Sequence, residues 1–147
     1  MILQRYYEPQ FTSSAGFLKR KEIREYSDRL IEEYDVRSGQ GAQTRARSVS
    51  GGNQQKAVFA RILMTHPNIF LCDEPTQGVD VKTRAEIHRL LREEANNGCG
   101  IIFVSSDLKE VMEIADRIQI ISSGRTRELL ENNGITSRQV LSCCYAM

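Results

Sequence analysis

Residues 48–76 read SVSGGNQQKAVFARILMTHPNIFLCDEPT, and two adjacent patterns in this stretch indicate the architecture of the chain. Ser50 is a residue type that often caps helices, and apolar residues recur behind it at helical spacing, so we predict a helix that ends before Pro67. The run at 69–72 is short, apolar and rich in branched side chains, which is typical of a buried strand. The apolar stripe of the predicted helix consists of Ala57, Ala60, Leu63 and Met64.

Similar apolar runs at 100–104 and 117–121 predict two further buried strands, parallel to the first. Helical patterns lie between the three strands, at 81–95 and at 107–115. A helix between two strands can carry the chain back for a right-handed crossover, which parallel pairing requires. This order of strands and helices indicates an α/β fold.

Helical patterns dominate the N-terminal half of the chain. Residues 17–34 have an apolar stripe on one side and charges on the other, as in an amphipathic helix. The stretch at 38–50 is polar and has no period, so we expect a loop there. We therefore divide the chain into a helical part, residues 1–66, and an α/β part, residues 67–147. The apolar stripe of the first helix consists of Ile23, Tyr26, Leu30, Ile31 and Tyr34.

Composition excludes several classes of protein. Of the 147 residues, 40% are hydrophobic and 27% are charged, which fits a globular protein and not a disordered one. The net charge is only +1, so we expect no nucleic-acid partner. No apolar run approaches the ~18 residues that span a bilayer, and the N-terminus does not look like a secretory signal, so we expect a cytoplasmic protein.

Cysteine and histidine give no sign of a metal site. The four cysteines form neither a CxxC pair nor a disulfide framework, and we interpret them as free thiols. His66 lies beside a proline, and His88 lies beside an apolar stripe. We expect both histidines on the solvated surface.

Two acids follow the first predicted strand, at the edge of the sheet where open α/β proteins bind ligands. Asp73 could hold Mg²⁺ through its water shell, and Glu74 could polarise an attacking water, as phosphoryl transfer requires. The alternative is a strand that ends in two solvated acids before a proline turn.

The start of the predicted helix offers a second ligand site. Unpaired backbone amides and the positive end of the helix dipole at Ser50, Gly51 and Gly52 would attract an anion such as phosphate. Glycine at both positions lets a phosphate approach, whereas a larger side chain would hold it away. The alternative is a capped helix with a flexible entry.

The two motifs together resemble those of the ATP-binding-cassette ATPases. SGGNQQK at 50–56 is similar to the family signature, DEPT at 73–76 to the Walker B end, and GVDV at 78–81 to the loop that follows it. The form GNQQK resembles the second nucleotide-binding half of bacterial importers of pentoses, galactosides and related sugars or nucleosides. The resemblance continues through VSSDL at 104–108 and ADRI at 115–118, and covers nearly the whole chain.

The resemblance implies a partial P-loop NTPase fold, with a helical subdomain before parallel strands and crossover helices, that lacks the phosphate-loop half. None of the ten glycines is followed by lysine, so no GxxxxGK[ST] is present in these residues. In the family, a complete site holds ATP between the phosphate loop of one cassette and the signature of another. We therefore expect the chain to hold ATP and Mg²⁺ only when another cassette completes the site.

The resemblance also implies roles for individual residues. Glu74 would be the catalytic base, and Asp73 would bind the metal. Many cassettes place a histidine after the strand at 100–104, and this chain has Ser106 in that place. The residues expected to contact the nucleotide are Ser50, Gly51, Gly52, Asn53, Gln54, Asp80 and Ser106.

Function and partners follow from the same resemblance. We expect a fragment of the ATP-hydrolysing subunit that energises sugar or nucleoside import, peripheral on the inner face of the bacterial membrane and inactive as an isolated chain. Its partners would be a membrane-spanning permease, another cassette and, indirectly, a periplasmic solute-binding protein. The alternative is a non-catalytic truncated product or regulatory module that docks on an intact cassette. Chromosome-maintenance and repair ATPases share both motifs, but their long coiled-coil insert is absent from this sequence.

The missing strand has a consequence for the sheet. In the family, the strand that leads to the phosphate loop lies between those that resemble 101–104 and 117–121. Without it, two rows of backbone donors and acceptors lack partners. We therefore predict that the isolated chain pairs 101–104 with 117–121 directly, self-associates, or is only marginally stable.

Overall fold

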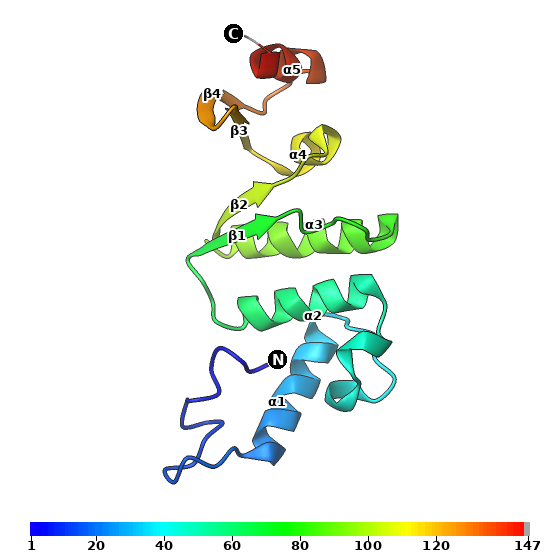
Figure 1. The fold of residues 1–147 in the computed structure, drawn as a ribbon, viewed down its shortest axis with the longest axis vertical. Helices are drawn as coiled ribbons and strands as arrows, with labels where there is room; N and C mark the ends of the chain where they lie inside the picture. Colours follow the sequence, from blue (N-terminus) through cyan, green and yellow to red (C-terminus); the bar gives the residue numbers. More distant parts are fainter. Residues whose placement is uncertain (146–147) are drawn as a thin grey trace. The chain divides into compact units, whose positions relative to one another are not determined.

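The structure, a computed structural model, describes residues 1–145, and the chain divides into two compact units (Figure 1). Residues 1–68 and 76–87 form the first, which we call the helical unit. Residues 69–75 and those from 88 onward form the second, the sheet unit. The chain therefore enters the sheet unit for one strand, leaves it after residue 75 and returns at residue 88.

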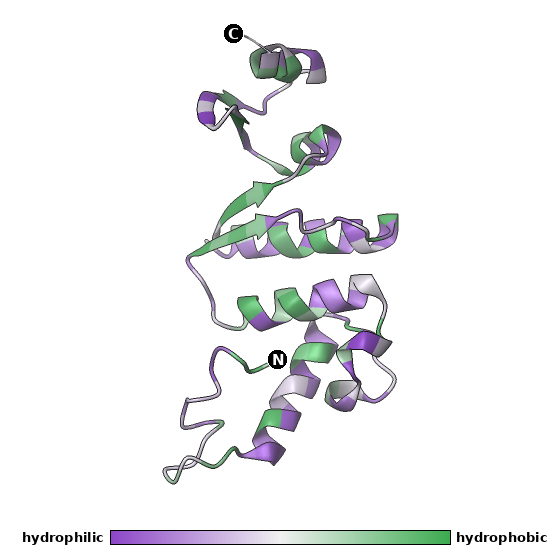
Figure 2. Cartoon of the chain, viewed as in Figure 1, coloured by the Kyte–Doolittle hydropathy of each residue, from purple (hydrophilic) through white to green (hydrophobic). Residues whose placement is uncertain are grey.

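The helical unit is built from the helices that the sequence predicts. The amphipathic helix expected at 17–34 is confirmed as α1 (Arg20–Glu33), and every residue of its apolar stripe is buried or half-buried. The second predicted helix is confirmed as α2 (Gly51–Leu63). Figure 2 shows polar residues at the start of α2 and mostly apolar ones toward its end. The expected loop at 38–50 contains two short 3-10 helices, η1 (Gly41–Gln43) and η2 (Ala46–Ser48).

A buried lysine joins three parts of the helical unit. Lys56, in α2, is 4% exposed, and its Nζ lies 2.6 Å from Glu86 Oε2 and 3.1 Å from Asp35 Oδ2. The same Nζ donates a hydrogen bond of 2.8 Å to the Asp35 carbonyl. Glu86 belongs to α3 (Val81–Asn96), and Asp35 follows α1. The charge can be buried because these oxygens replace its water, and the pattern of apolar residues gave no sign of it.

The sheet unit contains two separate two-stranded sheets. β1 (Ile69–Asp73) and β2 (Gly100–Val104) pair in parallel, with Ile69 opposite Gly100 and Asp73 opposite Val104 (Figure 1). The predicted strands at 69–72 and 100–104 and their parallel pairing are therefore confirmed, as are the two predicted helices that follow them. The remaining elements are α4 (Leu108–Ile114), β3 (Arg117–Ser122), β4 (Arg125–Glu131) and α5 (Ser137–Tyr145).

The prediction that these strands are buried is confirmed for only one face of β1. In β1, Phe70 and Cys72 are buried, whereas Ile69 and Leu71 on the opposite face are 68% and 64% exposed. Alternate residues of a strand point to opposite faces, so only one face of this sheet is covered within the sheet unit. Burial raises the pKa of the Cys72 thiol to about 12. The four cysteines are free, as expected.

Of the three alternatives that we predicted for the isolated chain, the direct pairing of 101–104 with 117–121 does not form, and the parallel pairing predicted for 117–121 is wrong. β3 pairs instead with β4, in antiparallel register, and the turn between them is Ser123 and Gly124, both with positive φ. Two residues of this kind close a tight hairpin, and a local turn costs less chain entropy than a distant pairing. The charged residues at 125–128 indicate by themselves only a short solvated strand or turn, and no sequence pattern indicates α5. The core of this part consists of Ile118, Ile120 and Val140, with apolar residues of α4 packed against them.

Within residues 1–145, none of the helices combines the length and the apolar character needed to cross a bilayer.

Candidate functional site

The end of β1 places two of the predicted site residues at its carboxyl edge, with a third beside them. Asp73 is the last residue of β1 and is exposed. The backbone N–H of Glu74 donates to the Val104 carbonyl at 2.9 Å, and the φ of Glu74 is 44°. Glu74 Oε1 accepts a hydrogen bond of 2.7 Å from the backbone N–H of Ser106. Glu74 and Ser106, 32 residues apart in sequence, thus lie together; we call this group, with the turn at 105–107, the acidic strand end.

The hydrogen bond between Ser106 and Glu74 orients a carboxyl group that could act on water. An N–H that donates to a carboxylate forms a short, charge-assisted bond, which fixes the orientation of the carboxyl group. Glu74 is half-buried, so part of this residue remains accessible to water. Such a group can take a proton from a water molecule or polarise it.

His88 is not on the surface, contrary to our expectation. It is 5% exposed, and its Nε2 lies 2.7 Å from Glu110 Oε1 in α4. The other oxygen of Glu110 accepts a hydrogen bond of 2.9 Å from the hydroxyl of Ser105. A buried histidine needs such a partner, and none is visible in a sequence pattern. One signal was present, because His88 lies three residues before the buried Leu91 and so on the same helix face. His66 is exposed, as expected.

The start of α2 forms the second site, which we call the signature turn, residues 50–54. Ser50 occupies the N-cap position, but its hydroxyl does not cap the helix. Instead, Ser50 Oγ accepts a hydrogen bond of 2.9 Å from Asn53 Nδ2, and Asn53 Oδ1 accepts one of 2.7 Å from the Arg37 N–H. Gln54 Nε2 donates to the Val49 carbonyl at 2.9 Å. The turn is therefore held by side chains of its own helix, not by a serine cap.

The two glycines of the signature turn have different surroundings. A Cβ on Gly51 would meet nothing within 4 Å, and Gly51 is exposed. A Cβ on Gly52 would lie 2.7 Å from Cγ2 and from Oγ1 of Thr83, closer than atoms can pack. Gly52 therefore admits the Thr83 side chain, whereas open space lies beside Gly51.

Asp80 is connected to this turn through the same threonine. Its carboxylate accepts hydrogen bonds from the Thr83 N–H at 3.0 Å and from the Thr83 hydroxyl at 2.8 Å. These bonds hold the pKa of the Asp80 carboxyl below its ordinary value, and the bond from the Thr83 backbone N–H has the larger effect. The structure thus links Asp80 to Gly52 by way of Thr83.

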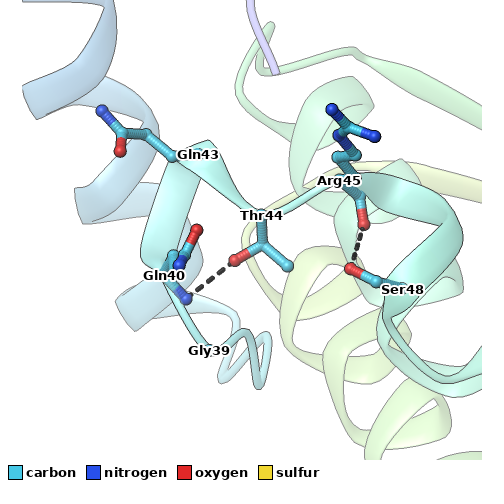
Figure 3. A pocket seen from close by; sticks show the side chains of 6 residues that line it. All are labelled: Gly39, Gln40, Gln43, Thr44, Arg45 and Ser48. Atoms are coloured by element: carbon cyan, nitrogen blue, oxygen red, sulfur yellow. Dashed lines mark hydrogen bonds between the residues drawn. The ribbon is translucent and has the colours of Figure 1, made fainter.

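A polar hollow of about 430 Å³ lies just upstream of the signature turn (Figure 3). Two hydrogen bonds connect residues of its lining (Figure 3). The Gln40 N–H donates to Thr44 Oγ1, and the Ser48 hydroxyl donates to the Arg45 carbonyl. It contains none of the predicted site residues. Its lining consists of Gly39, Gln40, Gln43, Thr44, Arg45 and Ser48.

The described residues do not form a complete metal centre. Among residues 1–145 no three or more His, Cys, Asp or Glu side chains come together in a way that could hold an ion. Asp73 could therefore supply only part of a coordination shell, which suits Mg²⁺, since that ion usually keeps several waters and binds phosphate oxygens.

The region that contains both motifs is similar to known proteins. Residues 6–77, which include the signature turn, Asp73 and Glu74, match the family model described as ABC transporter. A ribose import ATP-binding protein of Rhizobium meliloti is 40% identical over 129 residues, which are 88% of this chain and 25% of that protein. A xylose import ATP-binding protein of Burkholderia cenocepacia is 50% identical over 94 residues, 64% of this chain and 18% of that protein.

Among solved structures, the dimeric structure of a bacterial ABC transporter cassette is 26% identical, with a TM-score of 0.66. The match covers 82% of this chain and 51% of that cassette. The chain thus spans about a quarter of the length of the ribose relative.

Proposed function

Since this chain carries part of an ABC transporter domain in a partial cassette fold, we propose that it is a segment of the ATP-hydrolysing subunit that energises sugar import. The observation that supports this most is the hydrogen bond between the Ser106 N–H and the Glu74 carboxylate. It orients an acid at the carboxyl edge of a parallel strand pair, where α/β proteins bind ligands. A merely solvated acid would have no such fixed orientation.

The acidic strand end would act on the water that attacks the phosphoryl group. When bound, ATP supplies that group and Mg²⁺ neutralises the charge on it. Asp73 would hold the metal through its water shell, and Glu74 would accept a proton from the attacking water or polarise it. Ser106 keeps the Glu74 carboxylate in place through its N–H.

The signature turn would serve a different nucleotide, held by another cassette. Ser50 and the amides of Gly51 and Gly52 contact its γ-phosphate, helped by the positive end of the α2 dipole. Asn53 and Gln54 shape the turn by their hydrogen bonds to Ser50 and Val49. Asp80 supports it through Thr83.

Partners and location belong to the same proposal. The subunit would work on the inner face of the membrane with a membrane-spanning permease and another cassette, and indirectly with a periplasmic solute-binding protein. The solute would be a sugar, since the relatives named above are ribose and xylose import proteins. The isolated chain should neither bind ATP tightly nor hydrolyse it, because its residues include no GxxxxGK[ST] to hold the β- and γ-phosphates.

A chimera tests the function. This chain replaces the matching 129 residues of the ribose import ATP-binding protein, and Mg²⁺-dependent ATP hydrolysis is measured. We expect hydrolysis that Glu74→Gln abolishes, whereas Glu33→Gln, at an exposed position of α1, leaves it unchanged.

An inactive chimera that still folds and binds an ATP-loaded intact cassette would favour the other function, a non-catalytic docking module. That binding should then be lost in Ser50→Arg, which places a large side chain at the signature turn. Hydrolysis by the isolated chain, abolished by Glu74→Gln, would contradict the proposed need for another half.

A further inference from the structure

Two buried polar side chains are connected to the acidic strand end by hydrogen bonds. His88 in α3 is 5% exposed and Glu110 in α4 is 3% exposed. Their side chains are joined at 2.7 Å. Burying such groups is unfavourable unless their hydrogen bonds are made, so a pair like this is retained only where its bonds are well formed. Neither residue was among those expected to act at the site.

The pair continues into the turn after β2. Glu110 Oε2 accepts from the Ser105 hydroxyl at 2.9 Å, and Ser105 Oγ accepts from the Asp107 N–H at 3.1 Å. Asp107 caps α4 by accepting from the Lys109 and Glu110 amides at 3.0 and 3.4 Å. Ser106, whose N–H donates to Glu74, lies between the two residues that this network holds.

The chemistry of the groups sets the direction of each bond. The Ser105 hydroxyl donates to Glu110 Oε2, and an ionised Glu110 accepts from His88 Nε2 as well, since a carboxylate has no proton to donate. The Ser105 oxygen then has only lone pairs to offer to the Asp107 N–H. These bonds form one connected network from His88 through Glu110 and Ser105 to the backbone of the turn.

We propose that His88 and Glu110 are positioning residues for Glu74: through Ser105 they fix the turn at 105–107, so that the Ser106 N–H points at the Glu74 carboxylate. The catalytic meaning of this rests on the proposed function, but the positioning itself is a property of this chain. Neither residue touches Glu74 in the bonds described; both act through the backbone of the turn.

The test follows the backbone amide signal of Ser106 by NMR in the isotope-labelled 147-residue chain. Glu74→Gln replaces the charged acceptor by a neutral one and gives the signal expected of a weakened bond. We expect His88→Ala to move the Ser106 signal toward that value and to speed its hydrogen exchange about tenfold. His88→Gln can donate from a similar position and should restore both.

Two further variants separate positioning from general stability. Ser105→Ala keeps the buried pair but cuts its link to the turn, so it should shift the Ser106 signal as His88→Ala does. His66→Gln, at an exposed histidine of the helical unit, should leave the signal in place.

An unchanged Ser106 signal in folded His88→Ala, or in Ser105→Ala should the first variant not fold, would overturn the proposal. Failure of His88→Gln to restore the signal would also overturn it. No ATP is present in these measurements, so their result is independent of hydrolysis by the chimera.

Discussion

The helical unit and the sheet unit each contain a network around a buried ionisable side chain, but the two networks differ. In the helical unit, Lys56 is buried while its partners Asp35 and Glu86 have side chains that are 63% and 25% exposed. In the sheet unit, both His88 and Glu110 are buried, with side chains 7% and 2% exposed. When a side chain of the Lys56 network is removed, water can hydrate the carboxylates that remain. When His88 or Glu110 is removed, water cannot reach the partner that remains.

This difference teaches where the chain tolerates change. A carboxylate near the surface regains hydration when its partner is removed, so the loss is small. A buried group whose partner is removed keeps its desolvation penalty without the compensating bond. We therefore expect substitutions in the sheet unit network to be more damaging than equivalent ones around Lys56.

The largest effect is expected for Glu110→Leu. It leaves His88 and the Ser105 hydroxyl buried without their shared acceptor, and we expect a loss of about 3 kcal/mol in the free energy of unfolding. Urea unfolding followed by circular dichroism measures it. Glu113→Leu, at a neighbouring position of α4 that is exposed, serves as the control. A loss no larger than that of the control would remove the contrast between the two networks.

A smaller effect is expected within the signature turn. Gly52→Ala puts a methyl group 2.7 Å from Thr83, and we expect it to lower the free energy of unfolding by about 2 kcal/mol. Gly51→Ala, where nothing lies within 4 Å, should be neutral or slightly stabilising. The same unfolding measurement compares them. Equal losses for the two would mean that Thr83 does not pack against Gly52.

Lys56→Met should be milder still. Methionine fills much of the volume of the lysine stem, and Asp35 and Glu86 can both turn to solvent, so we expect a loss of about 1 kcal/mol. A loss as large as that of Glu110→Leu would show that the two networks are equally closed to water. Thermal unfolding of the two variants side by side decides this.

The smallest effect concerns pH. Hydrogen bonding to Lys56, followed by its charge, lowers the pKa of the Asp35 carboxyl below the ordinary value of 3.8. A carboxyl whose pKa is lower in the folded chain stabilises it above the unfolded pKa, and this contribution is lost as the pH falls through the folded pKa. Thermal melts of the wild type and Asp35→Asn should therefore differ above the ordinary value and converge at lower pH. A constant difference at every pH would contradict this.

Much of the fold could be predicted because the signals are local. The stripe that ends at Tyr34 predicts α1, and the apolar run at 69–72 predicts β1, since the period of apolar residues follows directly from helix or strand geometry. The hairpin of β3 and β4 was missed because its second strand is almost wholly exposed and so has little apolar alternation. Its turn, Ser123 and Gly124, was the available signal.

Some residues of the candidate site could also be predicted from the sequence, whereas the contacts between them could not. Asp73, Glu74 and the glycines of the signature turn were recognised from short motifs, because neighbours in sequence create their chemistry. The contact of Glu74 with Ser106, the fit of Gly52 against Thr83 and the burial of His88 each join residues that are many positions apart.

Residue order alone was sufficient for α1 to α4, the parallel strand pair and the acids at its edge, because each depends on groups within a few residues of one another. Only the tertiary structure showed that the Glu74 carboxylate accepts a hydrogen bond from Ser106, that Gly52 packs against Thr83 and that His88 is buried. The physical reason is that hydrogen bonds and packing act over a few ångströms of space, whatever the distance along the chain.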